Sequence, residues 1–324
     1  MLDRRRLLTV AGAALAAPSL GKAQAAWPNK PVRFVVPFPP GGAADLLARS
    51  LGQRLGDKLG QSFVIDNRPG AGTAIGTAAT AQSAADGYTI MIGTVSSHAI
   101  NPALSPKVGY DPIADFSPVA AFATLPFFLV AHPSVAARSP AELVALAKRE
   151  PGKINYASAG NGTSNHLAGE LFKLSTGTDI AHIPYRGSAP ALAAVIAGEC
   201  QLMFDLSITA MPQIQAGAVR AIAVASAARS PLTPNVATVA EAVPGFEASA
   251  WFGIFAPART PEPIVARLAA EIDAALGDAA IAERLAQQGA EPMRMGPAAF
   301  STFVRAELAR WSGVVRDAKI QADG

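Results

Sequence analysis

Hydrophobic and polar residues alternate along the chain with two periods, one typical of β-strands and one typical of α-helices. Residues 32–36, VRFVV, form an apolar run rich in β-branched side chains, which predicts a buried strand. Four leucines then recur at four-residue spacing, namely Leu47, Leu51, Leu55 and Leu59. The pattern stops at Gly60, so it predicts a helix that ends there. Residues 37–45, PFPPGGAAD, are therefore a loop that leads from a strand into a helix start.

The same order of strand, turn and helix recurs through the chain. Further strands are predicted at residues 63–66, 88–92, 154–157, 180–183, 202–205 and 221–225. A glycine-rich turn opens a helix of small residues within 68–84, and other helices are predicted at 139–150, 167–176 and 191–197. Strands that alternate with helices imply parallel sheets with helices on their faces. The sequence therefore predicts an α/β fold.

Two long apolar stretches interrupt this alternation. Residues 119–133 carry no charge and are too long for one ordinary strand, and we expect Pro126 to break them. Residues 246–261 form a second apolar and aromatic stretch, which leads into three closing helices. Two such crossings predict two lobes. The expected division is residues 26–124 with 249–324 for the first lobe and residues 125–248 for the second.

Residues 1–25 have the pattern of a cleaved secretory signal peptide. Three consecutive arginines, Arg4 to Arg6, precede an apolar stretch, and Ala23-Gln24-Ala25 is a small-x-small cleavage site. The apolar stretch is shorter than the roughly 20 residues that a membrane span needs. The order DRRRLL is compatible with both twin-arginine export and general secretory export, and both stay open. Either route predicts an exported protein.

Removal of this segment changes what the charge and the length imply. The chain has 27 basic and 24 acidic residues, and the predicted signal peptide contains four of the basic residues and one of the acidic residues. The mature chain thus has 23 of each, and a formal charge of zero argues against a nucleic acid as partner. Of the 324 residues 299 remain, which is more than one hydrophobic core usually serves and supports two lobes.

The usual signatures of catalysis and of cofactor binding are missing. The chain has four histidines, His98, His132, His166 and His182. No two of them stand at the spacing of metal ligands on one helical face. Ser164 lies in GTSNH, which lacks the second glycine of a hydrolase G-x-S-x-G. Residues 70–76, GAGTAIG, are one residue too long for a dinucleotide fingerprint, and no acidic residue ends the next strand.

We therefore expect no metal, no cofactor and no catalytic residue, and a binding protein rather than an enzyme. An exported α/β enzyme, dinucleotide-dependent or hydrolytic, is the alternative that these residues leave open.

Three strand-to-helix turns offer free backbone amides, namely residues 37–45, 158–166 and 184–190. A helix start carries about half a positive charge and several unpaired N–H groups, which suit an anion such as a carboxylate. Glycines allow a ligand to approach the backbone closely, and they stand at Gly41, Gly42, Gly160, Gly162 and Gly187. The fold alone explains any one such turn. Three of them, each at the carboxyl end of a strand, predict a cleft that binds an anion between the lobes.

Asp45 has two interpretations. At the third helical position a carboxylate stabilises the helix dipole by about 0.3–1 kcal/mol without any ligand, and we favour this role over a ligand contact. Arg68 and Arg186 could pair with a ligand carboxylate, but exposed arginines in turns are more often solvated.

Six stretches are specific in combination and stand in order along the mature chain. They are WPNKPVRFVVPFPPGGAADLLAR (27–49), DNRPGAGTAIG (66–76), DGYTIMIG (86–93), NYASAGNGTSNHLAGELF (155–172), HIPYRGSAPAL (182–192) and WFGIFAPARTP (251–261). Together they closely resemble the periplasmic solute receptors of tripartite tricarboxylate transporters, known as Bug receptors.

The resemblance implies a two-lobed, type II periplasmic binding-protein fold, in which each lobe has a mainly parallel sheet flanked by helices. It also implies a receptor, expected to be a monomer, that closes over one small carboxylate and delivers it to the membrane components of such a transporter. The carboxylate is held largely by backbone amides and waters. By resemblance, the contacts fall on Phe38, Gly41, Gly42, Asp45, Ser96, Ser97, Ser158, Gly162, Thr163, His166, Tyr185, Gly187, Ser188 and Asp205.

Two positions depart from the family pattern. The family often has an acidic residue where this chain has Ala194, and an asparagine where this chain has Leu206. Leu206 is close to the expected cleft, so this departure bears on the ligand more than on the fold. Which acid is bound, and whether a cognate transporter exists, stay open.

Overall fold

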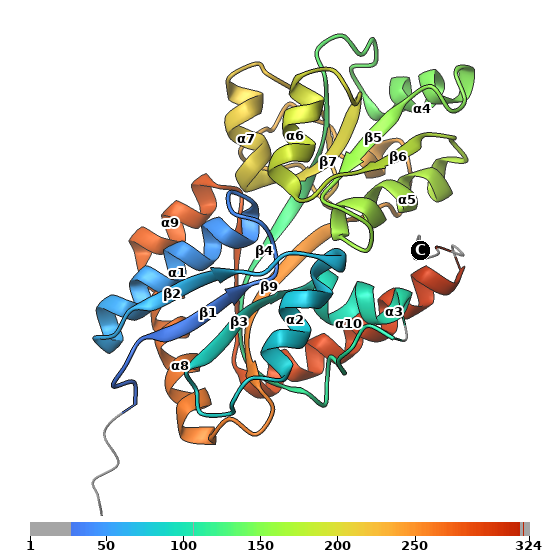
Figure 1. Cartoon of the computed structure of the whole chain (residues 1–324). Helices are drawn as coiled ribbons and strands as arrows, with labels where there is room; N and C mark the ends of the chain where they lie inside the picture. The colour runs from blue at the N-terminus through green and yellow to red at the C-terminus, as the bar shows by residue number, and fades with distance from the viewer. Residues whose placement is uncertain (1–26, 106, 318–319, 321–324) are drawn as a thin grey trace, which may run out of the picture.

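The computed structural model describes residues 27–105, 107–317 and 320, so the expected signal peptide lies outside the described residues. The described strands form one ten-stranded sheet with the central order β2-β1-β3-β9-β4-β7-β5-β6, while β10 and β8 pair with β4 (Figure 1). The strands are β1 (Val32–Val36), β2 (Phe63–Asn67), β3 (Thr89–Thr94), β4 (Phe116–Ala131), β5 (Asn155–Ser158), β6 (Ala181–Pro184), β7 (Leu202–Leu206), β8 (Arg220–Val224), β9 (Ser249–Pro257) and β10 (Glu291–Met295).

Helices follow most of the strands, as the alternating pattern predicted. They are α1 (Ala43–Leu59), α2 (Ala74–Ala81), α3 (Asn101–Leu104), α4 (Pro140–Arg149), α5 (Ser164–Thr176), α6 (Ser188–Ile196), α7 (Ser207–Gln215), α8 (Glu262–Leu276), α9 (Ala279–Gln287) and α10 (Pro297–Asp317). Short helical turns are η2 (Ala71–Thr73), η3 (Ser96–Ile100) and η4 (Val239–Glu241). All the predicted strands are confirmed, and α5 and α6 each begin three residues earlier than the pattern predicted.

The strand β4 runs through both halves of the sheet. Its first part pairs with β9 as far as Pro126, which lies opposite Ser249. Its last part pairs with β7 from Phe127 onward and with β8 from Phe128 onward. We call the half around β1, β2, β3, β9 and β10 lobe 1 and the half around β5 to β8 lobe 2. The molecule thus has the predicted two-lobed α/β architecture (Figure 1), and the residue boundaries given above for the lobes stay a prediction.

Pro126 does not break this stretch, contrary to expectation, because residues 116–131 form one continuous strand of 16 residues. A proline inside a sheet normally removes a hydrogen bond from the ladder. Pro126 stands where β4 exchanges β9 for β7 as its neighbour, so the missing amide hydrogen falls at a change of partner rather than inside a continuous ladder.

The parallel character of the sheet is confined to its outer strands. In lobe 1 the pairs β1–β2 and β1–β3 are parallel, and in lobe 2 so are β5–β6 and β5–β7. The crossing strands are antiparallel, since β9 runs against both β3 and β4, and β4 against β7. The carboxyl ends of the parallel strands in both lobes consequently lead into turns and helix starts, which is where an open sheet binds ligands.

Helices cover both faces of the lobe 2 sheet. On one face Tyr156 and Phe204 are fully buried in the same core cluster as Phe172 of α5. On the other face Met203 packs in a second cluster with residues of α6 and α7. Gly169 of α5 allows this helix to lie directly on the Tyr156 ring, because a Cβ atom at this position would collide with the ring.

This close approach gives a stability prediction. We expect Gly169→Ala to lower the free energy of unfolding by about 1–3 kcal/mol, since the added methyl group overpacks against Tyr156. Gly313→Ala in α10 is the matched control, because the nearest atom to its new Cβ would be the end of Arg316 at 3.8 Å. The control should be neutral or up to about 1 kcal/mol more stable, from helix propensity. Urea denaturation of both variants checks this, and equal stability of the two would contradict it.

Candidate functional site

The three predicted turns meet at one small cavity between the lobes. Its lining includes the first helical residues of α1 (Ala43 and Ala44), of α5 (Ser164 and Asn165) and of α6 (Ser188 and Ala189). Each of these helices follows the carboxyl end of a parallel strand, namely β1, β5 and β6. The topology therefore aims three helix N-termini, one from lobe 1 and two from lobe 2, at the same space.

None of these three helix starts is capped by the side chain of its own N-cap residue, although the Ser164 amide at the start of α5 donates to the Ser96 hydroxyl oxygen. The N-cap residues are Gly42, Thr163 and Gly187, and no side chain of theirs accepts a hydrogen bond from the first amides. The Thr163 hydroxyl instead donates to the Gly160 carbonyl oxygen at 2.6 Å. The first amides of a helix have no intrahelical acceptor and carry the positive end of its dipole. Three helix ends whose N-cap residues give no side-chain cap, meeting at one cavity, are a candidate site for an anion.

The cavity is small and contains no ionisable side chain. Its volume is about 20 Å³, which is room for about one water molecule. Apart from the helix ends it is lined by Phe38, Pro39, Pro40, Gly42, Thr94, Leu206, Ala250 and Phe252. An anion in this cavity would have backbone amides and a few hydroxyl or amide side chains as its partners, and no salt bridge.

A much larger cleft of about 930 Å³ lies beside the small cavity and shares Phe38 and Pro39 with it. Its walls come from residues 69–75, from α3 and from the residues after α3 in lobe 1, and from the turns 159–163 and 185–187 in lobe 2. Lys107 and Arg186 are the charged side chains in this lining, and no carboxylate is among them. The cleft could therefore accommodate the body of an acid whose carboxylate lies at the helix ends.

The structure distributes the residues expected at the site over three groups. Phe38, Gly42 and Ser188 line the small cavity. Gly162, Thr163, Tyr185 and Gly187 line the larger cleft, together with Phe38. The remaining residues line neither space, namely Gly41, Asp45, Ser96, Ser97, Ser158, His166 and Asp205.

Asp45 shapes the loop before α1. Its buried carboxylate accepts hydrogen bonds from the Gly41 amide at 3.0 Å, from Arg49 at 2.9 and 3.0 Å and from the Asn67 amide group at 2.9 Å. Asn67 also donates to the Phe38 carbonyl oxygen at 3.0 Å, which ties the loop to β2. Burial alone would raise the pKa of Asp45, but these hydrogen bonds outweigh it and hold the pKa below its ordinary value. The favoured structural role of Asp45 thus has a defined set of partners.

Ser96 and Ser97 are neighbours with different contacts. The Ser96 hydroxyl oxygen accepts a hydrogen bond from the Ser164 amide at 3.0 Å, which links lobe 1 directly to the start of α5 in lobe 2. The Ser97 hydroxyl stays within lobe 1, where it contacts the Thr94 amide at 2.9 Å and Nδ1 of His98 at 2.8 Å. Ser96 therefore joins the two lobes, whereas Ser97 fixes the end of β3.

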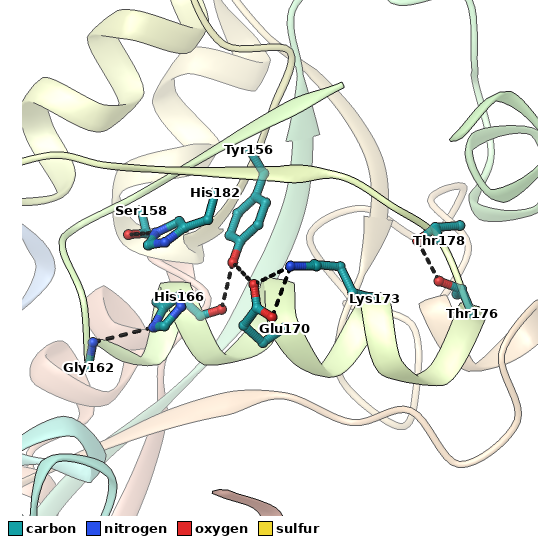
Figure 2. Close-up of polar contacts among 9 residues, drawn as sticks. All are labelled: Tyr156, Ser158, Gly162, His166, Glu170, Lys173, Thr176, Thr178 and His182. Carbon is teal, nitrogen blue, oxygen red and sulfur yellow. Dashed lines mark hydrogen bonds and ion pairs between the residues drawn. The ribbon is translucent and has the colours of Figure 1, made fainter. Parts of the chain in front are cut away.

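Hydrogen bonds hold the turn between β5 and α5 in its shape (Figure 2). Nδ1 of His166 accepts a hydrogen bond from the Gly162 amide at 3.3 Å, and the Ser158 hydroxyl oxygen accepts one from the Gly160 amide at 3.0 Å. Ser158 is fully buried, and His166 is 5% exposed. Both side chains face the turn from inside lobe 2, so they place the backbone of Gly162 and Thr163 along the cleft.

Behind this turn two imidazoles lie face to face, as Figure 2 shows for His166 and His182. Their ring centroids are 4.2 Å apart with an interplanar angle of 19°, and His182 also stacks on Tyr156 at 4.9 Å. Nε2 of His182 lies 2.6 Å from the Ser158 hydroxyl. Burial lowers the pKa of His182 to about 3, with a smaller effect from the charges of His166 and Lys173. His182 is therefore neutral over the usual range of pH.

Asp205 lies inside lobe 2, away from both spaces. Its neighbour Leu206 lines the small cavity, and because side chains of a strand alternate between faces, Asp205 is directed to the opposite side of β7. It is fully buried, and neither carboxylate oxygen has a hydrogen-bond partner among the described residues. Burial raises its pKa to about 7, and the nearby Thr209 hydroxyl and Leu206 amide oppose this only in part.

Sequence reasoning missed several residues of the cavity. Ser164 and Asn165 could have been found, because they are the first residues of a helix whose start was placed too late. Thr94 ends β3, two residues beyond the predicted strand, and is a similar case. Ala250 and Phe252 come from β9, far along the chain, and only the pairing of β9 with β3 and β4 brings them to the cavity. No local signal marks them.

The features that left an enzyme open have structural explanations. Gly76, in the glycine-rich segment 70–76, lets α2 pack closely, because a Cβ atom there would lie 2.6 Å from the Arg68 carbonyl oxygen. Ser164 is the first residue of α5, where its amide donates to the Ser96 hydroxyl oxygen at 3.0 Å, and Nδ1 of the nearby His166 accepts a hydrogen bond from the Gly162 amide at 3.3 Å. Within residues 27–105, 107–317 and 320, no group of three or more His, Cys, Asp or Glu side chains could hold a metal ion.

Comparisons with known proteins agree with this geometry. Residues 47–320 match the family described as tripartite tricarboxylate transporter family receptor. Protein BugT from Bordetella pertussis is 39% identical over 320 residues, which cover 98% of each chain. A solved structure of an R. palustris protein with adipate has a TM-score of 0.89 and 40% identity, and covers 91% of this chain and 99% of its own. MatC from Rhodopseudomonas palustris with bound malate has a TM-score of 0.85 and 35% identity, and the match covers 89% of this chain and 100% of the MatC chain.

The isolated carboxyl group of Asp205 gives a prediction about pH. In the unfolded chain Asp205 ionises near its ordinary pKa of 3.8, whereas in the folded chain it keeps its proton up to about pH 7. Its contribution to stability is therefore fully present below pH 3.8 and is lost as the pH rises towards 7 and above. Asp205→Asn should abolish this loss, so that the free energy of unfolding of the variant rises relative to that of the native protein between pH 4 and 7.

The measurement is the difference in free energy of unfolding between native protein and Asp205→Asn across this range. A difference that does not change with pH would contradict the assignment of the raised pKa. Since Asp205 lines neither space, affinity for a bound acid should change little in the variant.

Proposed function

The chain belongs to the tripartite tricarboxylate transporter receptor family, and from this premise we propose that its small cavity captures the carboxylate of a small organic acid. The acid is then delivered to the membrane components of a transporter of this type. The observation that carries the proposal is the meeting of three helix N-termini, none capped by its own N-cap side chain, at a cavity without ionisable side chains. Related structures with adipate and with malate support an acid as the ligand.

In this proposal the ligand carboxylate lies at the starts of α1, α5 and α6. Gly42 and Ser188 are adjacent to it, since both line the small cavity. Phe38 separates the carboxylate from the larger cleft, where Gly162, Thr163, Tyr185 and Gly187 contact the rest of the acid. Gly41, Asp45, Ser158 and His166 act as positioning residues, because they hold the turns through the hydrogen bonds described above.

Contacts across the lobes support capture by closure. Besides the hydrogen bond from Ser164 to Ser96, a Cβ atom built on Gly187 would lie 2.7 Å from the Pro39 ring. A Cβ atom on Gly41 would lie 3.9 Å from Ala189. The loop before α1 thus approaches the start of α6 closely, which fits a receptor whose lobes separate to admit the acid.

The receptor works in the periplasm, the compartment of its family, and we propose that the segment 1–25 directs its export and is then cleaved. None of the helices in the described part of the chain is long and apolar enough to span a membrane. We propose a monomer, for which the internal two-lobed cavity is complete. The receptor role accounts for the site without catalysis.

Thermal and chemical denaturation with a panel of carboxylates tests the proposal. A ligand present at 100 times its dissociation constant should add about 2.7 kcal/mol to the free energy of unfolding. The panel contains succinate, adipate, malate and aromatic acids, with the matching amides as neutral controls. Stabilisation by an amide equal to that by its acid, or no stabilisation by any acid, would count against the proposal.

A variant of the helix start tests the cavity itself. The backbone of Gly42 has φ of −85°, which valine can adopt, and a Cβ atom there would lie 4.0 Å from the Ser188 Cβ atom across the cavity. Gly42→Val should therefore fold and lose at least about tenfold in affinity for any acid that the native protein binds, because the side chain occupies the place of the carboxylate. Calorimetry measures the loss. Gly313→Val, remote from the cavity, is the control, and unchanged affinity in Gly42→Val would remove this helix end from the site.

A further inference from the structure

A strained turn forms part of the wall of the larger cleft. The four consecutive residues 70–73 line this cleft, and all four have positive φ, with values of 131°, 45°, 59° and 100°. Glycine adopts such values readily, but Ala71 and above all the β-branched Thr73 rarely do. Strain of this kind persists only where surrounding contacts impose it, and it is concentrated at functional and switching sites. The contacts that hold this turn therefore indicate what it does.

Asn101 of α3 holds the turn from within lobe 1. Its side-chain amide nitrogen donates one hydrogen bond to the Gly72 carbonyl oxygen and another to the Thr73 hydroxyl oxygen, the latter at 3.2 Å. Asn101 is only 7% exposed, so water competes little for these hydrogen bonds. One buried side chain thus fixes the two residues at the end of the strained turn.

The same turn and the same asparagine meet the opposite lobe. Gly72 faces the turn between β5 and α5, where a Cβ atom built on Gly72 would collide with the Asn161 carbonyl oxygen. A Cβ atom built on Gly162 would in turn collide with Oδ1 of Asn101. Glycine is therefore required on both sides for the lobes to come this close. We call Gly72, Asn101, Asn161 and Gly162 the latch.

The latch is separate from the helix starts that are proposed to hold the carboxylate. All four of its residues line the larger cleft, and none lines the small cavity. Gly72 and Asn101 belong to lobe 1 and the other two residues to lobe 2, so the contacts of the latch break when the lobes separate. In a receptor that captures its ligand by closure, the apparent affinity is proportional to the population of the closed state.

We infer that Asn101 is a positioning residue for ligand capture. With Gly72 it forms a latch that holds the lobes together, and it thereby sets the affinity for every acid by a common factor. This inference rests on the proposed function, because it assigns the control of closure around the same site.

Two glycine substitutions provide a matched test. Gly72 and Gly60 have similar φ, 59° and 72°, so alanine is equally strained at both positions, but the new Cβ atom at Gly60 has no atom within 4 Å. Calorimetry with succinate, adipate and malate should show that Gly72→Ala weakens binding of each acid that the native protein binds by at least about tenfold. The factor should agree between acids to within about twofold, since the closed state is shared. Gly60→Ala should bind as the native protein does.

Small-angle X-ray scattering measures closure itself. The radius of gyration of the native protein should fall when succinate, adipate or malate is added to saturation, whichever of these it binds. At its own saturating concentration Gly72→Ala should contract less, because the new methyl group meets the Asn161 carbonyl oxygen before the lobes are fully together. Contraction equal to that of the native protein would overturn the inference.

Asn101→Ala tests the latch from the other side and keeps the test decisive if Gly72→Ala fails to fold. Loss of two hydrogen bonds to the turn should weaken binding of each acid by at least about threefold, again by a common factor. Asn29→Ala is the control, because Asn29 also has a side-chain hydrogen bond, from the Tyr88 hydroxyl at 2.7 Å, but lines neither space.

The outcomes separate the inference from the proposed function. A loss in Asn101→Ala that differs between acids by more than about twofold would make Asn101 a ligand contact and overturn the inference. Unchanged affinity in Gly72→Ala and Asn101→Ala, while the native protein binds an acid, would overturn the inference alone. No binding of any of these acids to the native protein would overturn the proposed function and the inference with it.

Discussion

The hydrogen-bond ladder of β4 is the constraint on which the rest of this structure depends. One strand of 16 residues pairs with β9 and β10 in lobe 1 and with β7 and β8 in lobe 2, so the two lobes share a continuous backbone connection. This arrangement brings Leu206 at the end of β7 together with Ala250 and Phe252 near the start of β9 in the lining of the cavity. It also directs the carboxyl ends of the outer parallel strands of both lobes to the same space. The cavity is thus a product of the topology of the sheet as much as of its lining residues.

The electrostatics of the cavity come from the backbone. Three helix N-termini supply backbone amides and dipole ends, of which the Ser164 amide already donates to Ser96, and no lysine, arginine or histidine lines the cavity. Many of the polar side chains expected at the site instead shape the turns that present these amides. Asp45 does so for α1, and Ser158 and His166 do so for α5. Side chains thus fix the shape of the turns, and the backbone amides supply the positive potential that would attract an anion.

The sequence pattern predicted most of the strands and helices because their local signals agree with the final fold. The leucines of α1 and the apolar run of β1 are examples, and the three turns were found from their glycines and their place after strands. The errors have a common cause in tertiary structure. Pro126 lies in an unbroken strand because β4 changes its neighbouring strand there. The helix α7 and the strand β10 were not predicted. Ala250 and Phe252 reach the cavity only because β9 pairs with β3 and β4. Side chains of β7 alternate between its two faces, so either Asp205 or Leu206 can line the cavity but not both. The sequence of this strand alone does not show which face is turned to the cavity.

The uncapped helix ends have a consequence for how such a protein can change over time. Every residue except proline supplies the same amide, so substitutions that leave the cavity free, unlike Gly42→Val, would keep the proposed contact with a carboxylate. Side chains that line the cavity, such as Leu206, could then change while the backbone amides stay in place. On the proposed arrangement, a change of ligand preference would therefore come from the side chains around the amides and not from the amides themselves.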